Sequence, residues 1–172
     1  MKYVMLDFDG VLTTGEHCSW WLRSMDSGPR PRESDWFDPV CVERVQRLCQ
    51  TAGAVVVLST SWKSGVEPGV DAGNNEWPAI PGKLAELTAL LQEQGLIAPV
   101  VGSTPMLPTH LRGNEILLWL SRNNVARSDI VILDDYPAEL FPGLEDRLVC
   151  TAPGYDGFTE AHLATALELL SD

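Results

Sequence analysis

The chain of 172 residues has no long apolar run, and none of its stretches approaches the ~20 residues that span a bilayer. A membrane partner is therefore not expected. The apolar stretch that follows Lys2 is soon interrupted by acids and has no small-residue cleavage site, so it predicts a first β-strand and not a signal peptide. With a hydrophobic content of 45% and a charged content of 21%, the sequence predicts a globular, cytoplasmic protein.

Basic residues are scarce, since 12 Lys and Arg stand against 24 Asp and Glu and give a formal net charge of -12. An acidic chain repels phosphate backbones at long range, so non-specific binding to nucleic acids is disfavoured. Arg23, Arg30 and Arg32 lie close together, but Glu33 and Asp35 stand beside them. This mixture is more typical of a solvated loop than of an anion-binding patch.

The four cysteines form no CxxC pair, and no histidine completes a zinc-like spacing. Cys41 and Cys49 are eight residues apart in a predicted helix, where they share one face. Small buried thiols in a reducing compartment are therefore expected.

Helical and extended patterns alternate along the chain. Asp38 is a suitable helix cap, and Gly53 a suitable helix end, for the first of the predicted helices. The alternation predicts a single α/β domain over 1–172, with an open, mostly parallel sheet of about five strands flanked by helices. The predicted strands cover 2–8, 54–60, 96–103, 128–135 and 147–152, and the predicted helices cover 38–53, 82–94, 114–125 and 159–170.

Two segments interrupt this alternation. Residues 13–37 are rich in Trp, Arg, Gly and Pro and predict an irregular insertion, a small flap that packs on the domain. Residues 61–80 contain many Gly, Pro and Asn and have no period, so they predict a long loop. Loops of this length are usually lids, binding loops or disordered segments.

Polar residues stand at the carboxyl ends of three predicted strands, which meet at the ligand-binding edge of an open parallel sheet. Like charges gathered there require a cation or raised pKa values, and oxygen ligands without Cys or His favour Mg²⁺. Each acidic pair alone also fits an ordinary turn, but their convergence favours a site. The residues are Asp7 and Asp9 after the first strand, Ser59, Thr60 and Ser61 after the second, and Asp134 and Asp135 at the fourth.

Four segments resemble, in order, the motifs of the haloacid dehalogenase (HAD) superfamily: LDFDG, VLSTSW, LRGNEI and VILDDYPAEL. The likeness extends from Lys2 to about Cys150 and implies a Rossmann-like fold with phosphatase activity. The STSW and RGNEI segments further resemble the small HAD domains associated with RNA-repair proteins.

The resemblance implies a role for each motif. Asp7 would be the nucleophile that forms an aspartyl-phosphate, and Asp9 would move protons to the leaving group and from water. An acid at position 9 favours phosphoryl transfer over carbon–halogen cleavage. Thr60 would bind the phosphoryl group, with Ser59 or Ser61 in that place if the register differs by one residue.

The third motif requires a cation that offsets the phosphate charge. Arg112 fits its position best, and Lys63 is the competitor; the alternatives are a surface residue at a helix start and a solvated loop lysine. In the insertion, Trp20, Trp21 and Trp36 are available to stack on a base or sugar, or else to pack within the fold.

The implied cofactor is Mg²⁺. It would be held by Asp7, by the backbone carbonyl of Asp9 and by an acid of the fourth motif. Asp135 is favoured as the direct ligand, with Asp134 orienting it or binding through water.

A modest insertion leaves the site open, so that a large or polymeric substrate end could reach it. The expected partner is a phosphorylated small molecule or nucleotide. A polynucleotide 3′-end phosphatase is the alternative within enzymes, and a non-catalytic phosphate-binding module on the same fold is the alternative outside them. A signalling receiver domain fits poorly, because its phosphorylated Asp stands on the third strand. The pattern does not fix the oligomeric state.

Overall fold

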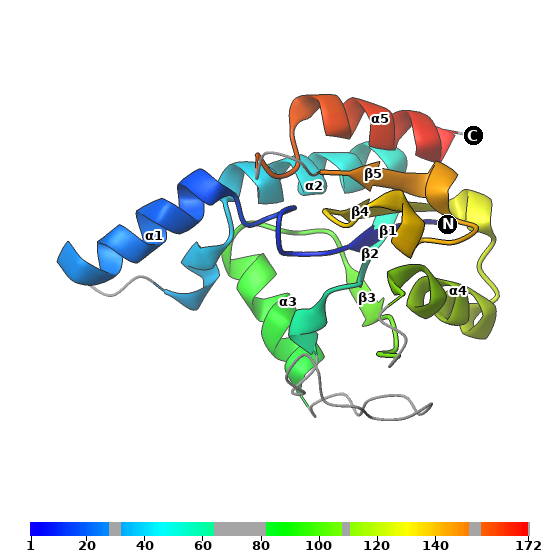
Figure 1. The fold of residues 1–172 in the computed structure, drawn as a ribbon, viewed down its shortest axis with the longest axis horizontal. Helices are drawn as coiled ribbons and strands as arrows, with labels where there is room; N and C mark the ends of the chain where they lie inside the picture. The colour runs from blue at the N-terminus through cyan, green and yellow to red at the C-terminus, as the bar shows by residue number, and fades with distance from the viewer. Residues whose placement is uncertain (28–31, 64–81, 108–110, 152–155, 172) are drawn as a thin grey trace.

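A computed structural model of the chain describes residues 1–27, 32–63, 82–107, 111–151 and 156–171 (Figure 1). Its centre is one five-stranded sheet in the order β3-β2-β1-β4-β5, in which every neighbouring pair is parallel. The predicted α/β, Rossmann-like open sheet is therefore confirmed. The strands are β1 (Lys2–Leu6), β2 (Ala54–Leu58), β3 (Val100–Ser103), β4 (Ile130–Asp134) and β5 (Leu148–Cys150).

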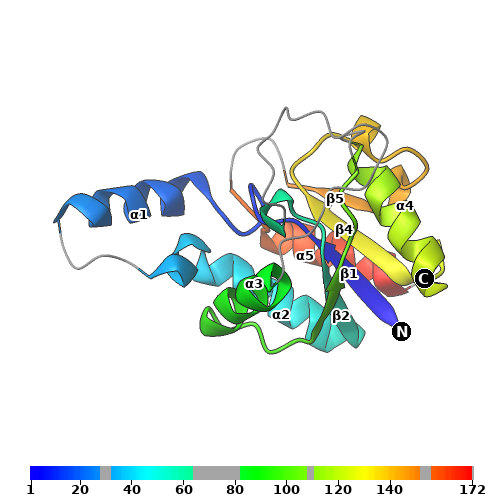
Figure 2. The same ribbon diagram turned by 90° about the horizontal axis from the view of Figure 1, so that it is seen from below.

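Helices cover both faces of the sheet, as the two perpendicular views show (Figures 1 and 2). Alternate residues of β1 enter opposite cores. Val4 and Leu6 pack with α2 (Pro39–Ala52), α3 (Lys83–Glu93) and α5 (Glu160–Ser171), whereas Met5 packs with α4 (Arg112–Asn123). Among the described residues, no helix has both the length and the apolar character that crossing a membrane requires.

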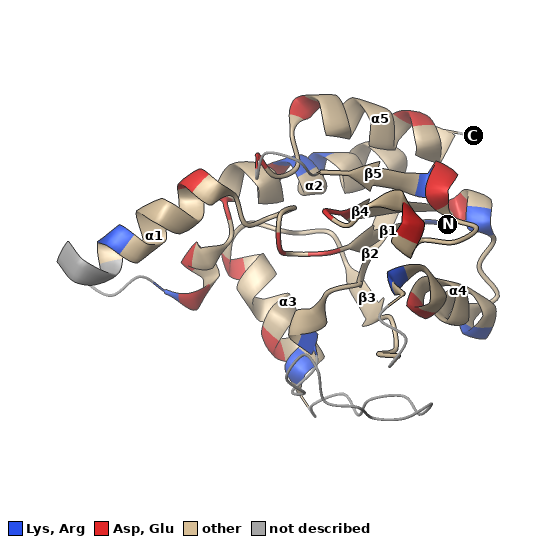
Figure 3. Cartoon of the chain, viewed as in Figure 1, with Lys and Arg blue, Asp and Glu red and all other residues tan. Residues whose placement is uncertain are grey.

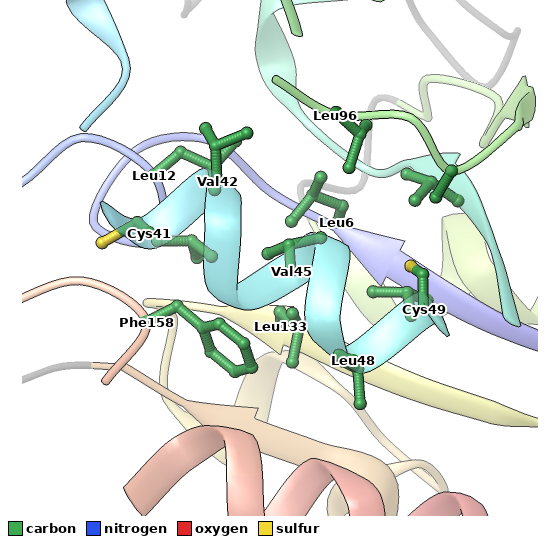
Figure 4. Packing of buried hydrophobic residues seen from close by; sticks show 14 of the residues in the cluster. Leu6, Leu12, Cys41, Val42, Val45, Leu48, Cys49, Leu96, Leu133 and Phe158 are labelled. Atoms are coloured by element: carbon green, nitrogen blue, oxygen red, sulfur yellow. The ribbon is translucent and has the colours of Figure 1, made fainter. Parts of the chain in front are cut away.

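Helix α2 begins and ends where its sequence predicts. The Asp38 side chain accepts a hydrogen bond from the backbone N–H of Val40, and Gly53 takes the left-handed conformation with φ of 61°. The buried face of the helix meets the central strands and α5, and it includes the predicted buried thiols (Figure 4). The side chains packed there include Leu6, Cys41, Val42, Val45, Leu48, Cys49, Leu133 and Phe158.

The prediction that the insertion over 13–37 is irregular was wrong. This segment contains helix α1 (Gly15–Ser27), which projects from the body of the molecule, and the short helix η1 (Glu33–Trp36) (Figure 2). The glycines and prolines of this segment stand at the ends of α1 and not inside it, so the average composition concealed a helix. The Thr14 hydroxyl accepts a hydrogen bond from the backbone N–H of His17, which fixes the start of α1.

Other boundaries differ slightly. Strand β2 ends at Leu58, and α4 begins at Arg112, two residues before the predicted start, so that Arg112 lies in its first turn. The predicted loop over 61–80 lies mostly outside the described residues, which include only its first turn, η2 (Ser61–Lys63). The remaining short helices are η3 (Arg127–Asp129), η4 (Ala138–Leu140) and η5 (Glu145–Arg147).

The packing of α4 makes a stability prediction at Gly113. A glycine-to-alanine change inside a helix ordinarily stabilises by about 1 kcal/mol. Here an added Cβ would lie 2.6 Å from the Cα of Phe141, so the overpacked Gly113→Ala variant should instead lose about 1–3 kcal/mol. Thermal unfolding measures this loss, at roughly 2–4 °C for each kcal/mol. Ser121→Ala, on the exposed side of α4, is the control and should unfold at or above the wild-type temperature.

Candidate active site

Backbone hydrogen bonds of the sheet continue past the ends of the strands and align the segments that follow them. The N–H of Asp7 donates to the carbonyl of Leu133 at 3.0 Å, and the N–H of Ser59 donates to the carbonyl of Leu6 at 2.8 Å. The acidic ends of β1 and β4 consequently lie side by side at one edge (Figure 3). Of the four carboxylates predicted to converge, Asp7, Asp134 and Asp135 lie together, whereas Asp9 is not part of their cluster.

Three carboxylates form the centre of this edge. Asp7, Asp134 and Asp135 each offer an oxygen, and these oxygens lie within 4.8 Å of one another. Asp7 and Asp134 are buried, and Asp135 is half-buried. One oxygen of each, Oδ1 of Asp7, Oδ2 of Asp134 and Oδ1 of Asp135, is buried without a hydrogen bond from the described residues. Such a set of oxygens fits a hard divalent cation such as Mg²⁺.

Gly10 allows the loop after β1 to approach Asp135. Its φ is +67°, and an added Cβ would lie 2.6 Å from the Cβ of Asp135. The Gly10 N–H donates to the hydroxyl of Thr13 at 3.1 Å, which holds the turn. Only a residue without a side chain fits between the two acidic segments.

Arg112 reaches the carboxylates from the first turn of α4. Its guanidinium lies 3.7 Å from Asp7 Oδ1 and 3.4 Å from Asp134 Oδ2, and it also stacks on the ring of Tyr136, 5.5 Å from its centroid. Because Arg112 is only 7% exposed, the alternative of a surface residue at a helix start is wrong.

Lys63 is a second buried cation, only 3% exposed, so the alternative of a solvated loop lysine is also wrong. Its ammonium group donates to the hydroxyl of Thr104 and lies 3.4 Å from Glu115 Oε2. Lys63 and Arg112 are therefore both buried and both lie close to Glu115, although the sequence presented them as competitors for one position.

Burial and charge shift the pKa values of these groups. Burial raises the pKa of Asp7 to about 8, with Asp134 adding to the rise and Arg112 opposing it. Burial likewise raises the pKa of Asp134 to about 6, again opposed by Arg112. Burial lowers the pKa of Lys63 to about 8, although Glu115 favours its charged form. The carboxylates are thus poised for a cation that would keep them ionised.

The balance of charge also favours a bound divalent cation. Asp7, Asp134, Asp135 and Glu115 supply four carboxylates, against the two cations Lys63 and Arg112. With all six groups ionised, two negative charges remain, which is the charge that one divalent cation neutralises.

The hydroxyl cluster after β2 divides into different environments. Ser59 is buried, and its Oγ makes no hydrogen bond to the described part of the chain. Thr60 is buried too, and its Oγ1 accepts a hydrogen bond from the backbone N–H of Trp62 at 3.3 Å. Ser61 is exposed at the start of η2. Ser59 and Thr60 lie on the carboxylate side of the sheet edge, and which one contacts a substrate stays a prediction.

Asp9 differs from the three clustered acids. Its side chain is exposed and is not part of the carboxylate cluster; its Oδ2 accepts a hydrogen bond from Trp62 Nε1 at 2.8 Å. The Trp62 ring is held by edge contacts with Phe8 and by tilted contacts with Phe37, each at 5.6 Å between centroids. The expectation that the backbone carbonyl of Asp9 contributes to the metal site stays a prediction.

The tryptophans of the insertion have separate environments. Trp21 packs edge-on against Trp36, 4.6 Å between centroids, which favours the alternative of packing within the fold. Trp20 is 46% exposed and lies beside His17, at 5.1 Å. A shallow pocket opens at the base of α1, lined by Glu16, His17, Trp20, Arg23, Asp38 and Pro39.

Sequence reasoning missed three residues of the site: Trp62, Thr104 and Glu115. Trp62 stands between two predicted site residues, and Glu115 follows Arg112 by one helical turn, so both were visible in principle from spacing. Thr104 follows the edge strand β3, where its N–H donates to the carbonyl of Leu58 at 2.9 Å. Nothing in the local sequence marks it.

Comparison with known proteins supports a family assignment. A family model described as the HAD domain in Swiss Army Knife RNA repair proteins matches residues 3–163, which includes all the site residues above. A comparison with curated proteins found no match.

The raised pKa of Asp7 predicts how the metal-free protein responds to pH. Between its ordinary value of 3.8 and about 8, the folded state retains a proton that the unfolded state has lost, so stability falls as pH rises through this window. Asp7→Asn should remove part of this slope and unfold at least ~2 °C above wild type at pH 8. Thermal unfolding in EDTA at pH 5, 6.5 and 8 measures this difference.

Asp129→Asn, at the opposite edge of the sheet, is the matched control and should keep the wild-type slope. Added Mg²⁺ should stabilise the wild type more at pH 8 than at pH 6, because protons then compete less for the carboxylates. Equal slopes for wild type and Asp7→Asn would contradict the raised pKa.

Proposed function

Because the chain belongs to the family of HAD domains found in Swiss Army Knife RNA repair proteins, we propose that it is an Mg²⁺-dependent phosphomonoester hydrolase. The observation that supports this most is the cluster of the buried Asp7 and Asp134 with the half-buried Asp135, beside two buried cations. A non-catalytic module that binds phosphate has no need of carboxylates, because they repel it.

The residues divide the reaction between them. An oxygen of Asp7 attacks phosphorus while the bond from phosphorus to the leaving oxygen breaks, which gives an aspartyl-phosphate. Asp9 donates a proton to the leaving oxygen and then accepts one from the water that hydrolyses the intermediate. Thr60 and the N–H groups of Arg112 hold the phosphoryl oxygens, with Ser59, Ser61 and Lys63 as further substrate contacts.

The metal would be held by Asp7, Asp134 and Asp135, with the backbone carbonyl of Asp9 as a further ligand. Bound there, Mg²⁺ would neutralise charge on the phosphoryl oxygens. Arg112 supports the same carboxylates, since its guanidinium faces both Asp7 and Asp134. Its planar group also remains charged at any physiological pH.

The family description favours a nucleic-acid end among the possible substrates, because it names RNA repair. The exposed Trp20 and the pocket at the base of α1 support this choice, since a base could stack there. The net charge of -12 weakens binding to a long phosphate backbone, which favours recognition of a terminus or a nucleotide.

Asp7→Asn tests the nucleophile. We expect it to lower kcat/KM by on the order of 10³-fold or more on an aryl phosphate, on mononucleotides and on 3′-phosphorylated oligonucleotides. Acid quenching with ³²P-labelled substrate should trap labelled protein from wild type only. EDTA should abolish wild-type turnover, and Mg²⁺ should restore it.

Asp129→Asn serves again as the control and should retain wild-type turnover. Equal rates for wild type and Asp7→Asn would disprove the nucleophile, and turnover that is indifferent to EDTA would disprove the metal dependence. Phosphate binding without turnover would support the non-catalytic alternative. Faster turnover of the oligonucleotide than of mononucleotides would identify a polynucleotide-end phosphatase.

The hydrogen bond from Trp62 to Asp9 makes a separate prediction. Trp62→Phe keeps an aromatic ring against Phe8 but removes the indole N–H that orients the carboxyl group. A nitrophenolate leaves without being protonated, whereas an alkoxide must be protonated as it leaves. The variant should therefore hydrolyse an alkyl phosphate ~10-fold more slowly than wild type, and should lose much less of its rate on 4-nitrophenyl phosphate.

The control is Trp119→Phe, a change of the same kind in the core on the α4 side of the sheet, which should leave the ratio of the two rates unchanged. An equal loss on both substrates would show that Trp62 acts through packing alone and does not orient Asp9.

A further inference from the structure

Glu115 is a buried carboxylate beside the two buried cations of the site, and the proposed reaction does not use it. It is only 5% exposed. Its Oε2 lies 3.4 Å from the ammonium of Lys63 and 3.9 Å from the guanidinium of Arg112, so one oxygen faces both cations. Its Oε1 accepts a hydrogen bond from the backbone N–H of Leu107 at 3.0 Å. Both oxygens therefore have defined partners.

The two cations come from different elements and repel each other. Lys63 follows β2, and Arg112 begins α4. Among the described residues, the groups that face Lys63 are Glu115 and Arg112 from α4, Asp7 directly after β1 and the hydroxyl of Thr104 after β3. Burial and Arg112 both disfavour a charged Lys63, and of the groups facing it Glu115 opposes them most strongly.

We propose that Glu115 is a positioning residue that holds Lys63, charged, beside Arg112, so that both cations present N–H donors to the phosphoryl group at Asp7. This inference rests on the proposed function. Glu115 acts through the cations and does not touch the substrate. Its bond to Leu107 fixes the carboxylate, so the distance between the cations is set by the fold.

The direction in which phosphate affinity changes when the Glu115 charge is removed distinguishes a positioning residue from a carboxylate that is merely nearby. A carboxylate near a phosphate site repels the ligand, so removal of a bystander charge would strengthen phosphate binding. Removal of a positioning carboxylate would weaken binding, and most at high pH, because Lys63 would then lose its proton more readily.

The test is Glu115→Gln, which keeps the shape of the side chain and an acceptor for Leu107. Binding of inorganic phosphate, measured by calorimetry with Mg²⁺ present, should be ~10-fold weaker than in wild type at pH 8 and close to wild type at pH 6. NMR of the Lys63 side chain should show its titration moved about one unit to lower pH. Glu93→Gln, an exposed acid at the end of α3, is the matched control and should match wild type in both measurements.

Unchanged or tighter phosphate binding in Glu115→Gln, or an equal loss at every pH, would overturn the proposal. Wild-type phosphate affinity should itself decline above pH 8, because Lys63 then loses its proton. If Glu115→Gln does not fold, Lys63→Arg is the second test. An arginine does not titrate in this range, so the decline should disappear, and its persistence would overturn the proposal. Wild-type turnover is measured separately, so a protein that binds phosphate but does not hydrolyse esters would contradict the proposed function and leave this test intact.

Discussion

The parallel pairing of β1 with β4 is the constraint on which the site depends. Their backbone hydrogen bonds continue to Asp7, whose N–H donates to the carbonyl of Leu133. Asp7, directly after β1, and Asp134, the last residue of β4, therefore lie at the same level. Adjacent strands lie about 4.8 Å apart, and the sheet therefore brings two carboxylates together whatever their mutual repulsion. The neighbouring cations, Gly10 and the expected metal all accommodate this enforced proximity.

The buried charges at this edge oppose stability as well as supporting chemistry. Desolvation raises the pKa of Asp7 and lowers that of Lys63, so each charged form is disfavoured where it stands. Apolar packing elsewhere must offset this, and the central strands contribute it on both faces. A stability cost from buried charges is typical of sites in which function and stability conflict.

The sequence predicted the sheet and its acidic edge well, because both depend on local patterns. Buried parallel strands read as continuous apolar runs, and the Asp pairs at their ends are visible without knowledge of the fold. Helix α1 was missed because the glycines and prolines at its ends dominated the composition of its segment. The single-domain prediction for 1–172 and the roles of the site residues stay predictions.

Contacts between segments that are distant in the sequence were harder to predict. Whether Lys63 or Arg112 is the site cation could not be decided from sequence, because the answer, that both are buried there, depends on how α4 packs beside the end of β2. The hydrogen bond between Trp62 and Asp9 joins residues 53 positions apart. No periodicity reports such a pair.

Helix α1 stands apart from the sheet and its acidic edge (Figure 2). It projects from the body, and its packing within the insertion is mainly on η1, through Trp21 and Trp36 (Figure 2). The carboxylates, by contrast, follow strands of the sheet itself. Under the proposed function, the carboxylates supply the chemistry and α1 supplies a surface for recognition. An exchange of the projecting helix would then redirect the protein to a new ligand without moving the carboxylates.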